Sequence, residues 1–215
     1  MITVPGRFHE ISITTPNLAA SVAFYRDLGF TEVETLPVWP HPYAVVSDGA
    51  VTLGLHQYKF PSPSITCVDE QLDAARRHVR DTGLALAFDI ADPQRFNEFG
   101  FRDPGGTMIT VLERATHRGL PRAAHDREAS RPSRCGRFVA FDLPTTNDEV
   151  SGNFWGATPA AGGLPIRWHD AHEDPGARLA FEVHAYADAS PDVLVAPEGT
   201  RLAIAVAKRS SAAGD

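Results

Sequence analysis

Cysteine, long apolar runs and excess basic charge are all scarce in this sequence, and each shortage excludes a class of protein. Only Cys67 and Cys135 occur among 215 residues, which is too few for a disulfide framework, so a reducing cytoplasmic location is expected. No apolar run approaches the roughly 18 residues of a membrane span, and the N-terminus lacks a signal-peptide pattern. The net charge of −7 gives no electrostatic reason to expect nucleic acid as a partner.

The motifs of several large enzyme classes are absent as well. The chain has no Gly-x-Ser-x-Gly nucleophile elbow, no phosphate-binding P-loop and no dinucleotide fingerprint. Apolar residues make up 43% of the chain, which is enough for one large domain or two small ones with buried cores. Any function must therefore be sought in a less common pattern.

The first third of the chain predicts the element order β-α-β-β-β. Apolar and polar residues alternate over 10–14, as in a strand with one apolar face. Asn17 suits a helix N-cap, and Gly29 occupies the position of a glycine that ends a helix. Strand-forming segments follow at 31–36, 43–46 and 50–56.

The same order is predicted again over residues 62–113. A short strand ends at Asp69, which is expected to cap the following helix. Its apolar stripe starts at Leu72, and Gly83 ends it. Three further strands are expected at 84–90, 95–103 and 107–113, with a turn at Asp103–Gly106 between the last two. Cys67 lies among apolar strand residues, so a buried, inert thiol is expected there.

Residues 114–135 interrupt this pattern. Six arginines and two acidic residues occur among Ala, Pro and Ser without apolar periodicity. A solvated linker between domains is the favoured interpretation. A basic contact arm for a regulatory or structural partner is the alternative.

The chain then repeats its opening. Residues 6–25 and 136–155 align without a gap and share seven of twenty residues, and the turn in 103–111 is echoed in 196–206. This self-similarity predicts a full domain at 1–113, made of modules 6–57 and 62–113, and a reduced copy at 136–207, followed by a tail at 208–215. Val139 and Ala140 replace His9 and Glu10, so the copy keeps the apolar frame and loses the polar residues.

Three segments carry a family resemblance: TTPNLAASVAFYRDLGF, DGAVTLGLHQ and FRDPGGTMITVLE. The aromatic pair Phe24-Tyr25, the Leu28-Gly29-Phe30 stop and the later Asp-Pro-Gly-Gly turn resemble the vicinal oxygen chelate superfamily, which contains glyoxalase I, bleomycin-resistance proteins and extradiol dioxygenases. The resemblance implies an α+β fold of paired βαβββ modules whose curved sheets enclose a small-molecule cavity. It leaves open whether the modules pair within one chain or in a homodimer.

Catalytic members of that superfamily hold a divalent metal, and the resemblance places four ligand positions in this chain. Glu10 matches the first, and the second falls at Gly54, one step from His56 on the same strand face. Ser62–Ser64 and Thr110 occupy the other two and offer no carboxylate or imidazole. A catalytic metal site usually has three protein ligands, so an incomplete site and no cofactor are expected.

A bound Ni, Zn, Mn or Fe ion is the alternative, held by Glu10 and His56 with His9 or Glu113. Strand alternation places His9 with Ile11 and Ile13, facing the helix, and places Glu113 away from the cavity as well. Only a bulge would turn Glu113 inward.

These observations favour a protein that binds a small apolar or aromatic molecule in the N-terminal cavity, as bleomycin-resistance proteins do. A metal-dependent glyoxalase, epimerase or dioxygenase, with His56 or Glu10 as the catalytic proton carrier, is the alternative. A regulatory or structural interaction protein is a second alternative. The predicted ligand-binding residues are Glu10, Ser12, His56, Thr110, Trp39, Tyr43 and Phe99.

Overall fold

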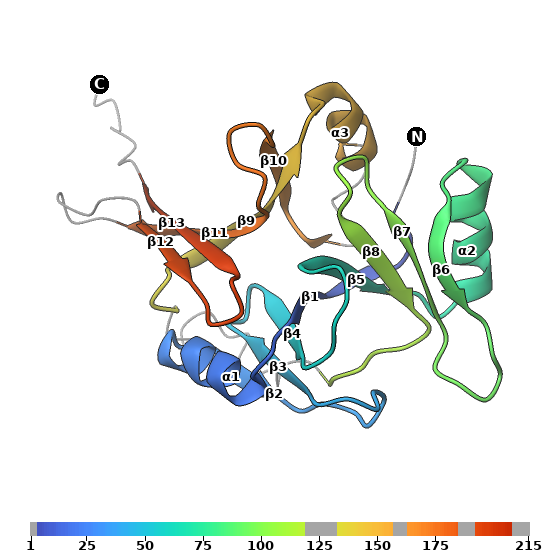
Figure 1. The fold of residues 1–215 in the computed structure, drawn as a ribbon, viewed down its shortest axis with the longest axis horizontal. Helices are drawn as coiled ribbons and strands as arrows, with labels where there is room; N and C mark the ends of the chain where they lie inside the picture. The colour runs from blue at the N-terminus through green and yellow to red at the C-terminus, as the bar shows by residue number, and fades with distance from the viewer. Residues whose placement is uncertain (1–3, 119–132, 157–162, 185–191, 208–215) are drawn as a thin grey trace, which may run out of the picture.

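The computed structural model describes residues 4–118, 133–156, 163–184 and 192–207, which form two mixed β-sheets and three helices (Figure 1). The first sheet has the strand order β2-β3-β4-β1-β5-β8-β7-β6. Its elements are β1 (Arg7–Thr14), α1 (Leu18–Asp27), β2 (Thr31–Val33), β3 (Tyr43–Ser47), β4 (Thr52–His56), β5 (Ser64–Val68), α2 (Leu72–Asp81), β6 (Leu86–Ile90), β7 (Glu98–Arg102) and β8 (Met108–Leu112). Two βαβββ modules therefore share one sheet, and the predicted α+β class is confirmed.

The second sheet is smaller and has the order β10-β9-β11-β13-β12. Its elements are β9 (Arg137–Thr145), α3 (Asp148–Trp155), β10 (Ile166–Asp170), β11 (Arg178–His184), β12 (Asp192–Val195) and β13 (Arg201–Ala207). None of the helices in the described ranges is long and apolar enough to cross a bilayer.

Both sheets share one pairing pattern. In the first, β4 and β1 are parallel, β1 and β5 antiparallel, β5 and β8 parallel, and β8 and β7 antiparallel. The strands β10, β9, β11, β13 and β12 repeat that series in the same order. The described part of the second sheet has no counterpart of β2, β3, β6 or α2. We propose that it is the reduced copy expected from the sequence repeat.

The helices α1 and α3 begin in the same way. Asn17 and Asn147 each accept a hydrogen bond from the backbone N–H three residues further on. A threonine two residues before each asparagine bonds a serine four residues after it, at 2.8 Å for α1 and 2.7 Å for α3. Such caps satisfy N–H and hydroxyl groups that would otherwise lack partners at a helix start. The repeated residues therefore preserve a working helix start.

Each of these helices also contacts a turn of the other sheet. The Tyr25 hydroxyl of α1 donates to Glu198 in the β12–β13 turn at 2.9 Å, and Ser21 bonds the other oxygen of that carboxylate at 2.6 Å. Trp155 of α3, aligned with Tyr25 in the repeat, donates from Nε1 to Asp103 in the β7–β8 turn at 3.1 Å. Figure 1 shows α1 beneath the red strands of the second sheet and α3 above β7 and β8. The two halves are thus joined by reciprocal contacts.

One hydrophobic cluster continues through both halves. It contains Ile11 and Ile13 of β1, Tyr25 of α1, and Phe181 of β11. The rings of Phe30 and Phe181 lie 6.4 Å apart, edge to face, across the boundary between the sheets. The apolar face of β1 is therefore turned toward α1 and the second sheet, which leaves its polar face for a cavity.

The predicted linker starts later than the sequence suggested. Backbone hydrogen bonds join Leu36 to Thr116 and Arg118 to Glu34, and Thr35 forms a β-bridge with His117. Thr116 and His117 are buried, because the chain leaving β8 continues along the segment that follows β2. Residues 119–132 of the predicted linker and the tail at 208–215 lie outside the described residues.

Candidate functional site

The polar face of the first sheet lines a cavity of about 330 Å³. Every strand residue in its wall is even-numbered, because alternate strand residues share one face. These are Glu10, Ser12, His56, Ser64, Thr66, Phe88, Glu98, Met108, Thr110 and Leu112. Loop residues complete the wall: Trp39, His41, Tyr58, Lys59, Phe60 and Pro61. The cavity therefore combines aromatic walls with a small number of polar groups.

The Glu10 carboxylate is the central polar group of the site. It is 1% exposed. One oxygen accepts from Ser12 Oγ at 2.8 Å and lies 3.1 Å from His56 Nε2, and the other accepts from the Tyr43 hydroxyl. Gly54 makes room for this arrangement, because a Cβ atom there would lie 2.0 Å from Glu10 Oε1.

Burial alone would raise the pKa of the Glu10 carboxyl. The hydrogen bond and charge of His56, the nearby His9 and the bond from Tyr43 outweigh burial and lower the pKa from 4.5 to about 2. Burial and the adjacent Glu10 carboxylate hold the pKa of Tyr43 well above its usual range. Glu10 is thus a fixed anion and Tyr43 a fixed donor near neutral pH.

His56 links the buried carboxylate to the cavity mouth. A carboxylate only accepts hydrogen bonds, so His56 Nε2 carries the proton that points at Glu10. His56 Nδ1 lies 2.9 Å from His41 Nε2, so the two rings share a hydrogen bond. The His41 ring stacks on Tyr58 with a centroid separation of 4.8 Å. The series Glu10–His56–His41 orients the imidazole of His56 and offers a route for a proton.

A second group of side chains surrounds Glu10 on the side away from the cavity. The pairing of β1 with β5 shifts between Phe8 and Glu10, and this bulge places His9 beside Glu10. The His9 ring stacks on His117 at 3.9 Å, and His117 Nε2 lies 3.8 Å from Glu10 Oε2. Regular alternation placed His9 away from Glu10, so that expectation is wrong, and the bulge is the reason. His117 was not predicted as a site residue, because the sequence assigned residues 114–135 to a linker.

His9, Glu10 and His117 form a candidate metal-binding group, with ligand atoms within 4.8 Å of one another. Burial lowers the pKa of His9 to about 4 and also lowers that of His117, so both imidazoles are neutral near pH 7, as ligands must be. The backbone N–H of Thr116 donates to His9 Nε2 at 3.1 Å, and the two rings are nearly parallel, at 13°. An ion would therefore have to displace that bond.

The family's own ligand positions do not fit a divalent ion. At two of these positions, Ser64 on β5 and Thr110 on β8 face the cavity with hydroxyl groups only. Four residues of the cavity wall carry metal-ligating groups: Glu10, His56, His41 and Glu98. Among the described residues, no three of these groups lie within 4.8 Å of one another. Glu10 and His56 already hydrogen-bond to each other. Three donors cannot converge there without rearrangement.

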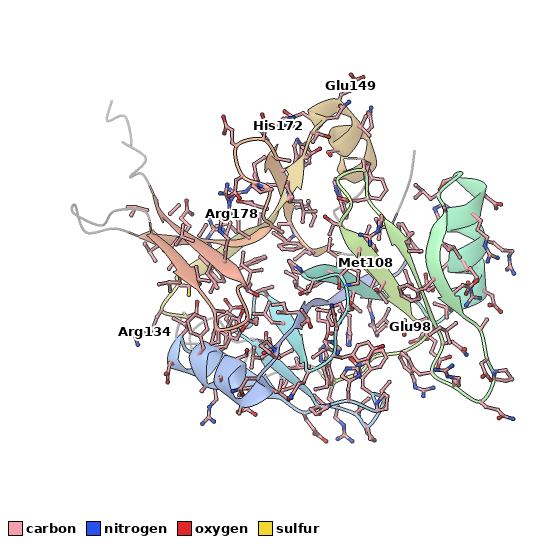
Figure 2. All side chains as sticks on the ribbon, in the orientation of Figure 1. Glu98, Met108, Arg134, Glu149, His172 and Arg178 are labelled. Carbon is pink, nitrogen blue, oxygen red and sulfur yellow. The ribbon has the colours of Figure 1, made fainter. Side chains whose placement is uncertain are left out.

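Glu98 is a cavity residue that the sequence reasoning missed. It lies on β7 opposite Leu112 of β8, and the wall around it includes Phe88 and Met108. Figure 2 labels Glu98 and Met108 at opposite ends of the β7–β8 pair. Burial raises the pKa of the Glu98 carboxyl to about 7, although Arg95 opposes the shift. Its even position on a strand that reaches the cavity was the available signal.

Three predicted residues take other places. Phe99 is fully buried on the opposite face of β7, where the Arg76 guanidinium lies 5.6 Å from its ring, so it lines the core. That prediction is wrong because Phe99 is odd-numbered on β7 and alternation turns it away. The Tyr43 hydroxyl donates a hydrogen bond to Glu10, but Tyr43 does not line the cavity. Glu113 bonds Asn97 in a separate open groove of about 570 Å³ over the start of α2.

The polar face of the second sheet carries a network of ion pairs. Ala140 and Asp142 stand where Glu10 and Ser12 stand in the repeat. Arg167 binds both oxygens of Asp142, at 2.7 and 3.0 Å. Arg178 bridges Asp142 to Asp174, at 3.3 and 3.1 Å. The second sheet therefore satisfies its polar face internally.

Comparisons with known proteins agree with this architecture. The homoprotocatechuate 2,3-dioxygenase of Arthrobacter globiformis superimposes with a TM-score of 0.58 at 14% identity, covering 96% of this chain and 81% of that one. A catechol 2,3-dioxygenase gives 0.55 at 12%, covering 100% and 92%. The Mn(II)-bound glyoxalase of Novosphingobium aromaticivorans gives 0.52 at 15%, covering 92% and 80%. Identities this low establish the fold alone. No curated protein sequence gives a significant match.

The fold and the cavity on its curved sheet define a protein of paired βαβββ modules. Residues 7–111 match the family model "Glyoxalase/Bleomycin resistance protein/Dioxygenase superfamily". This part of the chain is therefore a domain of that superfamily, the vicinal oxygen chelate superfamily, as the sequence resemblance predicted.

Proposed function

We propose that the protein binds a small apolar or aromatic molecule in the cavity of the first sheet, with the polar end of the ligand against His56. The observation that carries the proposal is the composition of the wall. Aromatic and apolar side chains surround the oriented pair His56 and Glu10. Binding sites for small molecules combine such walls with a few placed polar groups.

The hydrogen bonds of the Glu10 carboxylate support ligand binding without a metal ion in the cavity. Its carboxylate already has three hydrogen-bonding partners: Ser12, Tyr43 and His56. A satisfied, buried carboxylate gains little from a further partner. Glu10 therefore acts on the ligand through His56, by fixing its ring and its protonated nitrogen.

Filling the cavity tests this proposal. Thr110 lies on β8 between Met108 and Leu112, with all three side chains in the wall. Thr110→Phe should abolish binding of a neutral aromatic probe, 2-phenylethanol, which wild-type protein should bind as judged by tryptophan fluorescence and ligand-observed NMR. The matched control is Thr31→Phe on the exposed strand β2, which should bind as wild type does.

Folding of both variants is checked by circular dichroism and urea unfolding. If wild-type protein and Thr31→Phe show no binding, the proposal fails. Equal binding by Thr110→Phe would place the ligand elsewhere on the molecule.

A metal-dependent enzyme of the glyoxalase, epimerase or dioxygenase type is the second candidate. It is favoured by the group His9, Glu10 and His117. The superposed glyoxalase is described as Mn(II)-bound. When bound, a divalent ion would supply Lewis-acid polarisation of a substrate oxygen. In this chain His56, held by Glu10, would be the residue that moves a proton at the cavity wall.

Elemental analysis separates the two candidates. The metal-dependent candidate predicts stoichiometric Ni, Zn, Mn or Fe in purified wild-type protein, lost in His117→Ala and after chelation. The matched control is His172→Ala, since His172 is exposed at the far side of the second sheet (Figure 2). Stoichiometric metal in wild type and in this control, but not in His117→Ala, would overturn the metal-free proposal. Metal-free wild-type protein would exclude the second candidate.

A further inference from the structure

The cavity has an unequal distribution of charge. Glu10 and Glu98 are both in its wall, from β1 and β7. Among the wall residues, Lys59 is the only lysine or arginine, and its side chain is exposed at the mouth. Glu10 is held by His56, Tyr43 and Ser12. The cavity therefore favours a positively charged ligand group over a negatively charged one.

Glu98 differs from Glu10 in having no partner of its own. Within the described residues no hydrogen bond or ion pair engages its carboxylate, and the exposed Arg95 affects it only through its charge. Its register partner Leu112 on β8 and the Phe88 ring in the same wall offer no donor. A half-buried carboxylate in apolar surroundings gains free energy when a donor or a cation reaches it.

We propose that the ligand carries a protonated amine that binds Glu98, so that the ligand class is a small arylalkylamine. This inference rests on the proposed function, because it assigns a chemistry to the ligand of the same cavity. The aromatic side chains Trp39, Phe60 and Phe88 would face the hydrocarbon part of such a molecule and favour a cation near their rings. His56 would remain available to a second polar group.

An anionic ligand meets the opposite environment. A carboxylate placed near Glu98 would face a like charge in a partly desolvated wall, which costs free energy. A neutral hydroxyl would hydrogen-bond to Glu98 without the added attraction between opposite charges. The order of affinity should therefore be amine, then alcohol, then carboxylate.

Three matched probes test this order: 2-phenylethylamine, 2-phenylethanol and phenylacetate, measured by isothermal titration calorimetry at pH 8. This pH lies above the pKa of about 7 that burial gives Glu98, so the carboxylate is charged. Wild-type protein should bind the amine about tenfold more tightly than the alcohol, with phenylacetate weakest.

Glu98→Gln should reduce the amine's advantage to about twofold while leaving the affinity for the alcohol unchanged within about threefold. The matched control is Glu149→Gln. Glu149 is exposed on α3, far from Glu98 in Figure 2, and its variant should keep the full advantage.

Failure of the two proposals is distinguishable. If the alcohol binds but the amine has no advantage, or if Glu98→Gln keeps the full advantage, the amine inference fails and the cavity proposal stands. Preferential binding of phenylacetate also overturns the inference alone. If no probe binds to wild-type protein, both proposals fail.

Discussion

At the scale of single residues, the site depends on which side chains balance the buried Glu10 carboxylate. Three donors converge on it: Ser12, Tyr43 and His56. Strand alternation correctly predicted that Glu10 and Ser12 share a face with His56, because side chains of a regular strand alternate strictly. The position of His9 could not be predicted, since a bulge is a local irregularity that the residue pattern does not encode.

Glu10→Gln should lower the free energy of unfolding at pH 7 by about 2 to 3 kcal/mol. The amide NH₂ group of glutamine would face side chains that are themselves donors, and the remaining hydrogen bonds would no longer be to a charged group. In wild type the pKa of Glu10 is about 2 when folded and 4.5 ordinarily. A lowered folded pKa stabilises the protein above pH 4.5, and that contribution is lost as the pH falls toward 2. Urea unfolding of both proteins over this range should show the difference shrinking with acid.

The same experiment on Glu149→Gln should show little difference at any pH, since that carboxylate is exposed. A Glu10→Gln variant as stable as wild type at pH 7 would contradict the hydrogen-bond assignment.

At the scale of elements, the register of β4 against β1 decides whether the site can exist. Gly54 pairs with Ser12, and this places the glycine under the Glu10 carboxyl group. The sequence indicated the family ligand position near Gly54, but only the packed strands explain why the residue is a glycine. Any side chain at this position would occupy the space of the carboxylate.

Gly54→Ala should displace the Glu10 carboxylate and break its bond to His56, because the added Cβ would lie 2.0 Å from Glu10 Oε1. We expect a loss of about 1 to 3 kcal/mol in the free energy of unfolding and weaker binding of 2-phenylethanol. Urea unfolding and fluorescence titration measure the two effects. Gly152→Ala in α3 is the control, because its nearest outside atom would be 3.7 Å away. Unchanged binding by Gly54→Ala would show that Glu10 does not organise the cavity.

The contacts of α1 and α3 with turns of the opposite sheet are the second feature at this scale. Tyr25→Phe and Trp155→Phe each remove one hydrogen bond to a turn of the other sheet while keeping a ring in place. We expect each change to cost about 1 to 2 kcal/mol. Because the two contacts share no partner, the double variant should cost the sum within about 0.5 kcal/mol. Urea unfolding measures all three proteins, and a variant without any loss would show that its contact does not stabilise the junction.

At the scale of the whole molecule, the second sheet packs against the first through a shared hydrophobic cluster. The hydrophobic cluster is continuous between Phe30 and Phe181. Asp142 and its arginine partners satisfy the polar face of the second sheet, whereas the corresponding face of the first sheet lines the cavity. The second sheet thus covers apolar residues of the first half of the chain, such as Phe30.

A chain shortened to residues 1–118 should therefore be much less stable than the full protein. It would expose the apolar surfaces of Tyr25 and Phe30 that the second sheet now covers. We expect increased binding of a hydrophobic dye and a lower midpoint of thermal unfolding. A fragment as stable as the full chain, and without dye binding, would show that the first sheet folds independently.

The sequence by itself determined the strand alternation, the helix caps and turns, the repeat and hence the fold family. The alternation, the caps and the turns depend on residues close together in the chain, whose preferences act through local backbone geometry. Only the tertiary structure decided that His9 and His117 join Glu10 and that the cavity wall beside Glu98 is apolar. Those outcomes depend on a bulge and on the packing of distant strands, where burial sets the free energy of each polar group.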